Sequence, residues 1–232
     1  TVPREKVISL IGPNGAGKTT FFNMLTGVYK PTSGTVTFLG EDVTGKPPHA
    51  ITERGMGRTF QNIRLFQNMT ALENVMVGRH VRTRSGLIGA VFRTGAFKAE
   101  EAAIAQRAQE LLDYVGIGRF AQYKARTLSY GDQRRLEIAR ALATDPKLIA
   151  LDEPAAGMNA SEKLVLRQLI DQIRKDGRTI LLIEHDVKLV MGLCDRLTVL
   201  DYGKQIAEGT AAEVQKNPKV IEAYLGADHK AH

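Results

Sequence analysis

The chain has 232 residues, of which 43% are hydrophobic and 25% are charged, and its formal net charge is +7. This composition is typical of a soluble globular protein with one α/β domain, or with a core and a smaller inserted subdomain. No apolar run approaches the roughly 20 residues that cross a bilayer. The single cysteine, Cys194, excludes an internal disulfide and favours a reducing compartment, and we interpret it as a small buried hydrophobic residue.

The positive charge is spread along the chain, and its densest cluster comprises Arg79, Arg82, Arg84 and Arg93. Grooves that bind single-stranded nucleic acid place aromatic side chains between the basic ones, whereas aromatic residues make up only 6% of this chain. We therefore interpret the excess as a solvated surface, and leave open whether it faces an anionic membrane.

The first motif follows an apolar strand predicted at 6–11. A strand, a glycine-rich turn and a helix that begins near Lys18 form the context in which a phosphate-binding loop is expected. The glycines allow backbone N–H groups to close around phosphates, Lys18 is expected to contact the β- and γ-phosphates, and the Thr19 hydroxyl is expected to bind Mg²⁺. The predicted loop comprises Gly12, Pro13, Asn14, Gly15, Ala16, Gly17, Lys18, Thr19 and Thr20.

The next part of the chain predicts a half-exposed antiparallel strand at 35–39, after the turn at 31–34. Gln61 follows as a lone amide at the junction between the core and a helical block, and from its type alone it is unremarkable.

The middle of the chain, residues 65–145, predicts an all-helical block. Thr70 and Glu73 form a capping-box pattern before a helix at 71–78. Residues 83–96 are rich in glycine and predict a loop, and residues 98–115 predict a strong helix. Another helix is expected at 129–144, with Ser129 as its N-cap, Asp132 completing a box-like cap and Asp145-Pro146 ending it.

The C-terminal part returns to strands, predicted at 147–152, 179–184 and 197–202. The first two are continuously apolar, which is typical of strands buried on both faces of a parallel sheet. Two carboxylates, Asp152 and Glu153, end the first of these strands. Asp152 is a candidate Mg²⁺ ligand and Glu153 a candidate acceptor for the proton of an attacking water.

A second polar cluster follows the strand at 179–184. Because parallel strands end at the same sheet edge, His185 is placed where it can hydrogen-bond a γ-phosphate. A lone histidine is more often structural, and the position after a core strand is what favours a function here.

These motifs, in this order, resemble an ABC-type ATPase over essentially the whole chain. The segments 58–62, 128–135, 153–159 and 217–226 are similar to an ATPase subunit of the bacterial high-affinity branched-chain amino acid importer. The resemblance implies a P-loop NTPase fold of the α/β class. It has a RecA-like, mostly parallel sheet core at 1–64 and 146–232, an inserted helical subdomain at 65–145 and a small antiparallel β portion.

The resemblance also implies roles that spacing does not show. Gln61 would sense the γ-phosphate and share in the Mg²⁺ site with Thr19 and Asp152, while Glu153 and His185 would act at the γ-phosphate. The signature segment would contact ATP held by a second ATPase subunit in a head-to-tail homo- or heterodimer; it comprises Ser129, Tyr130, Gly131, Asp132 and Gln133. Transmembrane permease subunits would dock near residues 61–80, at the cytoplasmic face of the inner membrane, and neither nucleic acid nor the transported solute would touch this chain.

The chain departs from the family pattern in its signature, in the loop after Glu153 and at its start. Tyr130 and Asp132 replace the first glycine and the glutamine of Leu-Ser-Gly-Gly-Gln, and Asn159 stands where the loop usually ends in Asp. Asn159 can still cap the next helix. The family has further residues before the phosphate loop, including an aromatic that stacks on adenine, so we expect part of the N-terminus to be missing.

The sequence therefore predicts an ATPase that uses ATP and Mg²⁺ to drive import of branched-chain amino acids. Import of urea, amides or another small solute stays open, because this chain is not expected to contact cargo. A soluble ABC ATPase that acts on nucleic acid and an ATP-binding switch without hydrolysis are the remaining alternatives. An ABC ATPase that acts on nucleic acid would usually carry two ATPase domains or a long coiled coil. Glu153 and His185 argue against a switch that does not hydrolyse ATP.

Overall fold

The computed structural model describes residues 2–82 and 95–228, which form two compact units. The core unit comprises Thr1–Ile51 and Lys147–His232, and the helical unit comprises Thr52–Pro146. The assignment of 65–145 as an inserted subdomain stays a prediction. Arg84, Arg93 and most of the loop predicted at 83–96 lie outside the described residues.

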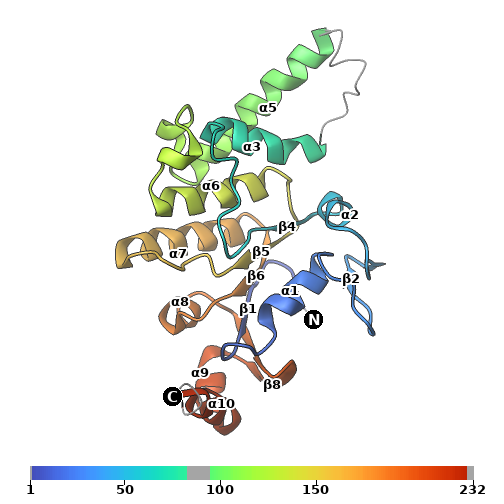
Figure 1. The fold of residues 1–232 in the computed structure, drawn as a ribbon, viewed down its shortest axis with the longest axis vertical. Coiled ribbons are helices and arrows are strands. Elements are labelled where there is room, and N and C mark those ends of the chain that lie inside the picture. The colour runs from blue at the N-terminus through green and yellow to red at the C-terminus, as the bar shows by residue number, and fades with distance from the viewer. Residues whose placement is uncertain (1, 83–94, 229–232) are drawn as a thin grey trace. The chain divides into compact units, whose positions relative to one another are not determined.

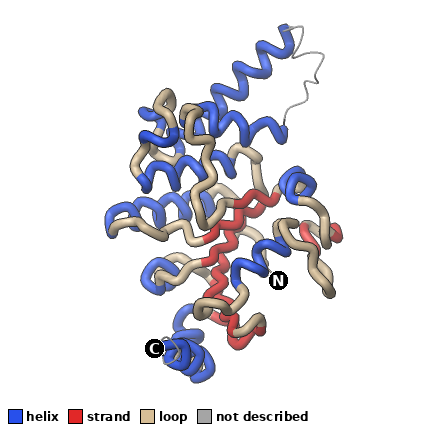
Figure 2. Tube along the Cα trace, in the orientation of Figure 1, coloured by secondary structure: helices blue, strands red, loops and turns tan. Residues whose placement is uncertain are grey.

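The core unit is built on a sheet whose strands lie in the order β5-β6-β1-β7-β8 (Figures 1 and 2). Every pair in this order is parallel except β7–β8, which is antiparallel. All residues of β5 and β6 are buried, as expected for apolar strands covered on both faces. The strands are β1 (Val7–Ile11), β5 (Leu148–Asp152), β6 (Thr179–Ile183), β7 (Arg196–Asp201) and β8 (Lys204–Gly209).

Helices of the core unit pack against the strands of this sheet, for example α7 against β6 and α9 against β7. In α7 the buried residues Leu166, Leu169, Ile170 and Ile173 recur at helical spacing and form one apolar face. A second cluster, which includes Val190, joins the C-terminal helices to β7. The helices are α1 (Lys18–Leu25), α2 (Pro48–Glu53, across the unit boundary), α7 (Ala160–Lys175), α8 (Val187–Met191), α9 (Ala211–Gln215) and α10 (Pro218–Asp228).

The small antiparallel portion consists of β2 (Thr37–Phe38) and β3 (Glu41–Asp42). The strand predicted at 35–39 is therefore shorter than expected. It ends at Phe38, because Leu39 and Gly40 follow with φ angles of 52° and 85° and form the turn to β3 in the left-handed region. The mixed, mostly parallel sheet predicted from the sequence is confirmed.

The helical unit packs α3 against α5 and α6. Thr70 accepts from the Glu73 backbone N–H and the Glu73 carboxylate accepts from Thr70, which confirms the capping box. Helix α5 begins three residues before the predicted start at 98, and the predicted helix 129–144 is confirmed with slightly shorter bounds. The elements are β4 (Met56–Arg58), α3 (Ala71–Arg79), η1 (His80–Arg82), α5 (Gly95–Tyr114), η2 (Gly118–Phe120), η3 (Ala125–Thr127) and α6 (Tyr130–Leu142).

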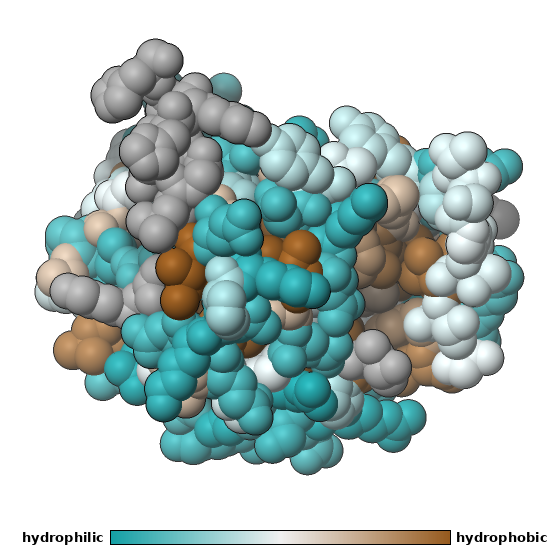
Figure 3. All heavy atoms as spheres, turned by 90° about the horizontal axis from the view of Figure 1, so that it is seen from below, coloured by the Kyte–Doolittle hydropathy of each residue, from teal (hydrophilic) through white to brown (hydrophobic). Residues whose placement is uncertain are grey.

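Within the described ranges, no helix combines the length and the apolar character needed to span a membrane. The face drawn in Figure 3 is mostly hydrophilic, with hydrophobic patches between the polar side chains.

Candidate functional site

The loop between β1 and α1 has a glycine with a positive φ at each end. Gly12 has a φ of 151°, and a Cβ atom there would lie 2.1 Å from the Leu200 carbonyl oxygen. Gly17 caps α1 with a φ of 94°, so the first N–H groups of this helix follow a left-handed turn. A strand, a glycine-rich loop and a helix that starts at Lys18 are therefore arranged as the motif predicts.

Lys18 folds back over this loop. Its ammonium group donates to the carbonyl oxygens of Gly12, at 2.8 Å, and Pro13, at 3.0 Å. Burial lowers the pKa of Lys18, and the nearby negative charges of Glu153 and Asp152 oppose that shift. The Lys18 ammonium group and the carboxylates of Asp152 and Glu153 are thus close enough to interact electrostatically.

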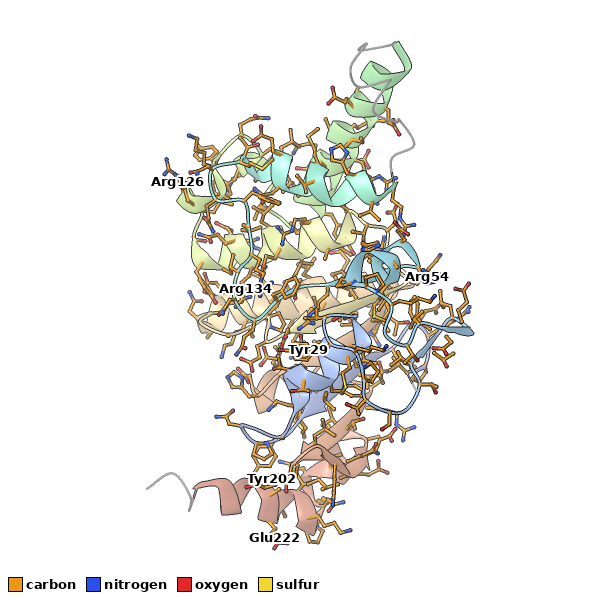
Figure 4. All side chains as sticks on the ribbon, turned by 45° about the vertical axis from the view of Figure 1, so that its right-hand side comes forward. Tyr29, Arg54, Arg126, Arg134, Tyr202 and Glu222 are labelled. Carbon is orange, nitrogen blue, oxygen red and sulfur yellow. The ribbon has the colours of Figure 1, made fainter. Side chains whose placement is uncertain are left out.

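The outer side of the loop is supported by the C-terminal part of the chain. The Gly203 N–H, in the β7–β8 turn, donates to the Ala16 carbonyl at 2.9 Å. Burial raises the pKa of Tyr224 in α10, and the nearby Gly12 backbone opposes that shift. A cavity of about 410 Å³ lies between residues 13–16, this turn and α10, and Tyr202 and Glu222 line it (Figure 4). The β7–β8 turn therefore supports the loop, in addition to β1 and α1 at its two ends.

The two carboxylates occupy different surroundings. Asp152 is 1% exposed, whereas the Glu153 side chain is 18% exposed. Glu153 has a φ of 48°, an uncommon conformation for a residue with a side chain, and its N–H donates to the Ile183 carbonyl at 2.9 Å. Strained backbone of this kind is concentrated at functional positions, because surrounding structure must hold it in place.

His185 and Glu184 follow β6 beside Glu153. The His185 Nδ1 atom lies 3.8 Å from Glu153 Oε2 and 3.9 Å from Glu184 Oε2, and its side chain is 63% exposed. Glu184 is 1% exposed and accepts from the backbone N–H groups of Ala155, His185 and Asp186. This carboxylate therefore ties the loop after Glu153 to the loop that carries His185.

Glu184 was not predicted as a site residue from the sequence, although a signal was present. It is an acidic residue directly after a fully apolar strand, as Asp152 and Glu153 are near the end of β5.

Further along, Asn159 accepts from the Glu162 N–H at 3.0 Å and begins α7 with a capping box, so its expected capping role is confirmed.

The signature segment begins α6 in the helical unit. Ser129 accepts from the Asp132 N–H at 3.2 Å and donates to the Asp132 carboxylate at 2.8 Å, so it is the N-cap. Asp132 also pairs with Arg135, and the Gln133 amide donates to the Leu128 carbonyl at 3.0 Å. The side chains of Asp132 and Gln133 therefore interact within their own chain.

Gln61 lies in the same unit, in the segment that follows β4. Its carbonyl accepts from the Arg134 guanidinium, and the Tyr130 hydroxyl accepts from the same guanidinium at 2.9 Å. The structure thus brings Gln61 and the signature segment together through Arg134, a residue that sequence analysis did not single out. Lys18, Asp152, Glu153 and His185 belong to the core unit.

Comparisons with known proteins agree with this geometry. A family model described as "ABC transporter" matches residues 1–156, and one described as "Branched-chain amino acid ATP-binding cassette transporter" matches residues 204–230.

Curated relatives match nearly the whole chain. The BraF protein of Pseudomonas aeruginosa, a high-affinity branched-chain amino acid transport ATP-binding protein, is 47% identical over 97% of this chain and 89% of its own length. The corresponding LivG protein of Escherichia coli is 47% identical over 96% of this chain and 88% of its own.

Solved structures share the fold. A nucleotide-free ATP-binding cassette from an ABC transporter superposes with a TM-score of 0.83 and 34% identity, covering 96% of this chain and 89% of that one. A dimeric cassette bound to ADP and phosphate superposes with a TM-score of 0.76 and 28% identity, covering 91% of this chain and 88% of that one. The chain therefore belongs to the ABC transporter family, as one of its ATP-binding cassettes and within the branched-chain amino acid group.

Proposed function

We propose that this chain is the ATP-hydrolysing subunit of an importer that takes up branched-chain amino acids through separate membrane subunits. The observation that carries the proposal is that β1 and β5 both pair in parallel with β6, so the loop that leads to Lys18 and the carboxylates of Asp152 and Glu153 follow strands that end at the same sheet edge. The similarity to BraF and LivG, both branched-chain amino acid transport proteins, supports the transport class and the cargo.

ATP binding follows from the loop at residues 12–20. Its backbone N–H groups and the start of α1 supply donors and partial positive charge for the phosphates. Lys18 has its ammonium over the loop, so it is placed to exchange its two carbonyl partners for phosphate oxygens.

The residues present fit a bound Mg²⁺. The Thr19 hydroxyl and the Asp152 carboxylate are oxygen donors of the kind that Mg²⁺ prefers, and Gln61 is the third proposed ligand. Within the described part of the chain, no group of three or more His, Cys, Asp or Glu residues gathers as a metal site. This is consistent with an ion that takes its other ligands from phosphates and water, and that neutralises phosphate charge when bound.

Hydrolysis is assigned to Glu153, with His185 beside it. The partly exposed Glu153 carboxylate is available to orient a water and accept its proton, whereas Asp152 is buried. His185, 3.8 Å from that carboxylate, is placed to donate to the γ-phosphate, and Gln61 is proposed to sense the same group.

A second ATPase subunit is the proposed partner at the signature segment. Ser129 and Gly131, at the start of α6, would donate to the γ-phosphate of ATP held by that subunit. The dimeric cassette among the solved structures supports this arrangement. We further propose that the complex binds permease subunits at the cytoplasmic face of the inner membrane.

The test is reconstitution with the permease subunits proposed as partners. We expect phosphate release that rises when leucine, isoleucine or valine is supplied. Stimulation by urea or amides alone would contradict the proposed cargo, and stimulation by DNA or RNA without membrane subunits would contradict the transport function. ATP binding without any phosphate release would favour the non-hydrolytic alternative.

A further inference from the structure

Arg134 is a buried cation that joins the signature helix to the segment carrying Gln61. It is 3% exposed, and its guanidinium donates to the Phe60 carbonyl at 2.9 Å and to the Gln61 carbonyl. The same group donates to the Tyr130 hydroxyl at 2.9 Å and to the Glu137 carboxylate at 3.2 Å. Arg134 extends from α6 toward this segment in Figure 4.

Glu137 holds the other end of the segment. It is 2% exposed, and its second carboxylate oxygen accepts from the Arg64 backbone N–H at 2.8 Å. Burial raises the pKa of Glu137, and the hydrogen bond from Arg64 and the charge of Arg134 act against that shift. The segment 60–64 is thus attached to α6 through its backbone at both ends.

The chemistry of this pair favours positioning over simple stabilisation. A buried ion pair gains little net stability, because two charges must leave water. A planar guanidinium with several donors in fixed directions instead sets the positions of the carbonyls that it contacts. Phe60 is held further by guanidinium groups over its ring, Arg58 at 4.9 Å and Arg64 at 4.4 Å from the centroid.

Tyr130 is the unusual member of this group. It replaces a glycine of the general signature, and a glycine would supply neither the hydroxyl that bonds Arg134 nor the ring that lies 5.3 Å from its guanidinium carbon. The side chain is thus engaged within its own chain, next to Ser129 and Gly131, the residues proposed to face the partner's ATP.

We propose that Tyr130 and Arg134 are positioning residues that fix the backbone of Gln61 from the signature helix of the same chain. This inference rests on the proposed function, in which Gln61 senses the chain's own ATP and the signature contacts the partner's. Arg134 then links the two nucleotide sites through one side chain, so that a shift of α6 at one site moves Gln61 at the other.

A double-mutant cycle in the reconstituted transporter tests this inference. Tyr130→Phe removes the hydroxyl and keeps the ring, and it is measured alone and together with Gln61→Ala. We expect Tyr130→Phe to lower kcat at least about tenfold in the wild-type background, the loss typical of one hydrogen bond to a charged group. In the Gln61→Ala background the same change is expected to have no further effect on kcat, because the side chain whose placement depends on the fixed backbone of residue 61 is absent.

Tyr123→Phe is the matched control, since Tyr123 is an exposed tyrosine of the same unit that lies outside this network. It is expected to leave kcat unchanged. An equal loss from Tyr130→Phe in both backgrounds, or no loss in either, would overturn the inference while ATP hydrolysis by the wild type stands. A wild-type complex that binds ATP and releases no phosphate would overturn the proposed function, and this inference with it.

Discussion

The ammonium group of Lys18 lies in the field of the Glu153 carboxylate, although β6 separates the strands from which the two residues emerge. Adjacent strands are about 4.8 Å apart, so the ends of β1 and β5 are within reach of one triphosphate. The candidate site depends on this relationship, because it places the phosphate-binding loop and the proposed catalytic carboxylate at the same sheet edge.

Lys18→Ala is expected to weaken ATP binding at least tenfold, because charge-assisted hydrogen bonds to phosphate contribute about 1.5–3 kcal/mol. Calorimetric titration with ATP measures the effect. Lys216→Ala, at an exposed lysine, is the matched control and should bind as the wild type does. Unchanged affinity in Lys18→Ala would remove the loop from the proposed site.

Asp152→Asn is expected to abolish the gain in nucleotide affinity that Mg²⁺ provides. The neutral amide is a weaker ligand for a hard divalent cation than the carboxylate. Titrations with and without EDTA separate this effect from a loss of folding, since ATP binding in EDTA should match that of the wild type. A full Mg²⁺ effect in the variant would exclude Asp152 as a ligand.

Cys194 is expected to react very slowly with thiol reagents at pH 8 in the native protein. Burial disfavours the thiolate and raises the pKa of Cys194 to about 12, so the reactive form is rare at that pH. Because it is the single cysteine of the chain, absorbance with a disulfide reagent reports it alone. Denatured protein provides the control, and equal rates in both states would show that the thiol is accessible.

Asn159→Ala is expected to destabilise the protein by about 1 kcal/mol through loss of the α7 cap, whereas Asn159→Asp should retain stability. Urea unfolding of the two variants measures the difference. If Asp destabilises as much as Ala, capping does not explain the residue at this position.

The sequence predicted those elements whose signals are local. The continuously apolar strands β5 and β6 and the capping box at Thr70 each depend on neighbouring residues, and each was found near its expected place. Strand β8 was missed because it lies at the sheet edge and carries polar residues such as Lys204 and Gln205, so it lacks the apolar run of a central strand.

The residues missed at the candidate site act through distant parts of the chain. Arg134 matters because its guanidinium contacts the carbonyls of Phe60 and Gln61, which are remote in sequence. Glu184 matters because it accepts an N–H from Ala155, after another strand. Spacing along the sequence does not reveal such contacts, whereas it does reveal a loop like 12–20, whose residues are consecutive.

The central claim is that Glu153 directs water onto ATP that the loop at 12–20 has bound. The most direct measurement compares ATP binding and phosphate release in Glu153→Gln and in Glu101→Gln, a control at an exposed glutamate. We predict that Glu153→Gln binds ATP with wild-type affinity or tighter, loses nearly all turnover and accumulates as an ATP-bound dimer, whereas the control behaves as the wild type. Normal turnover by Glu153→Gln would contradict the account.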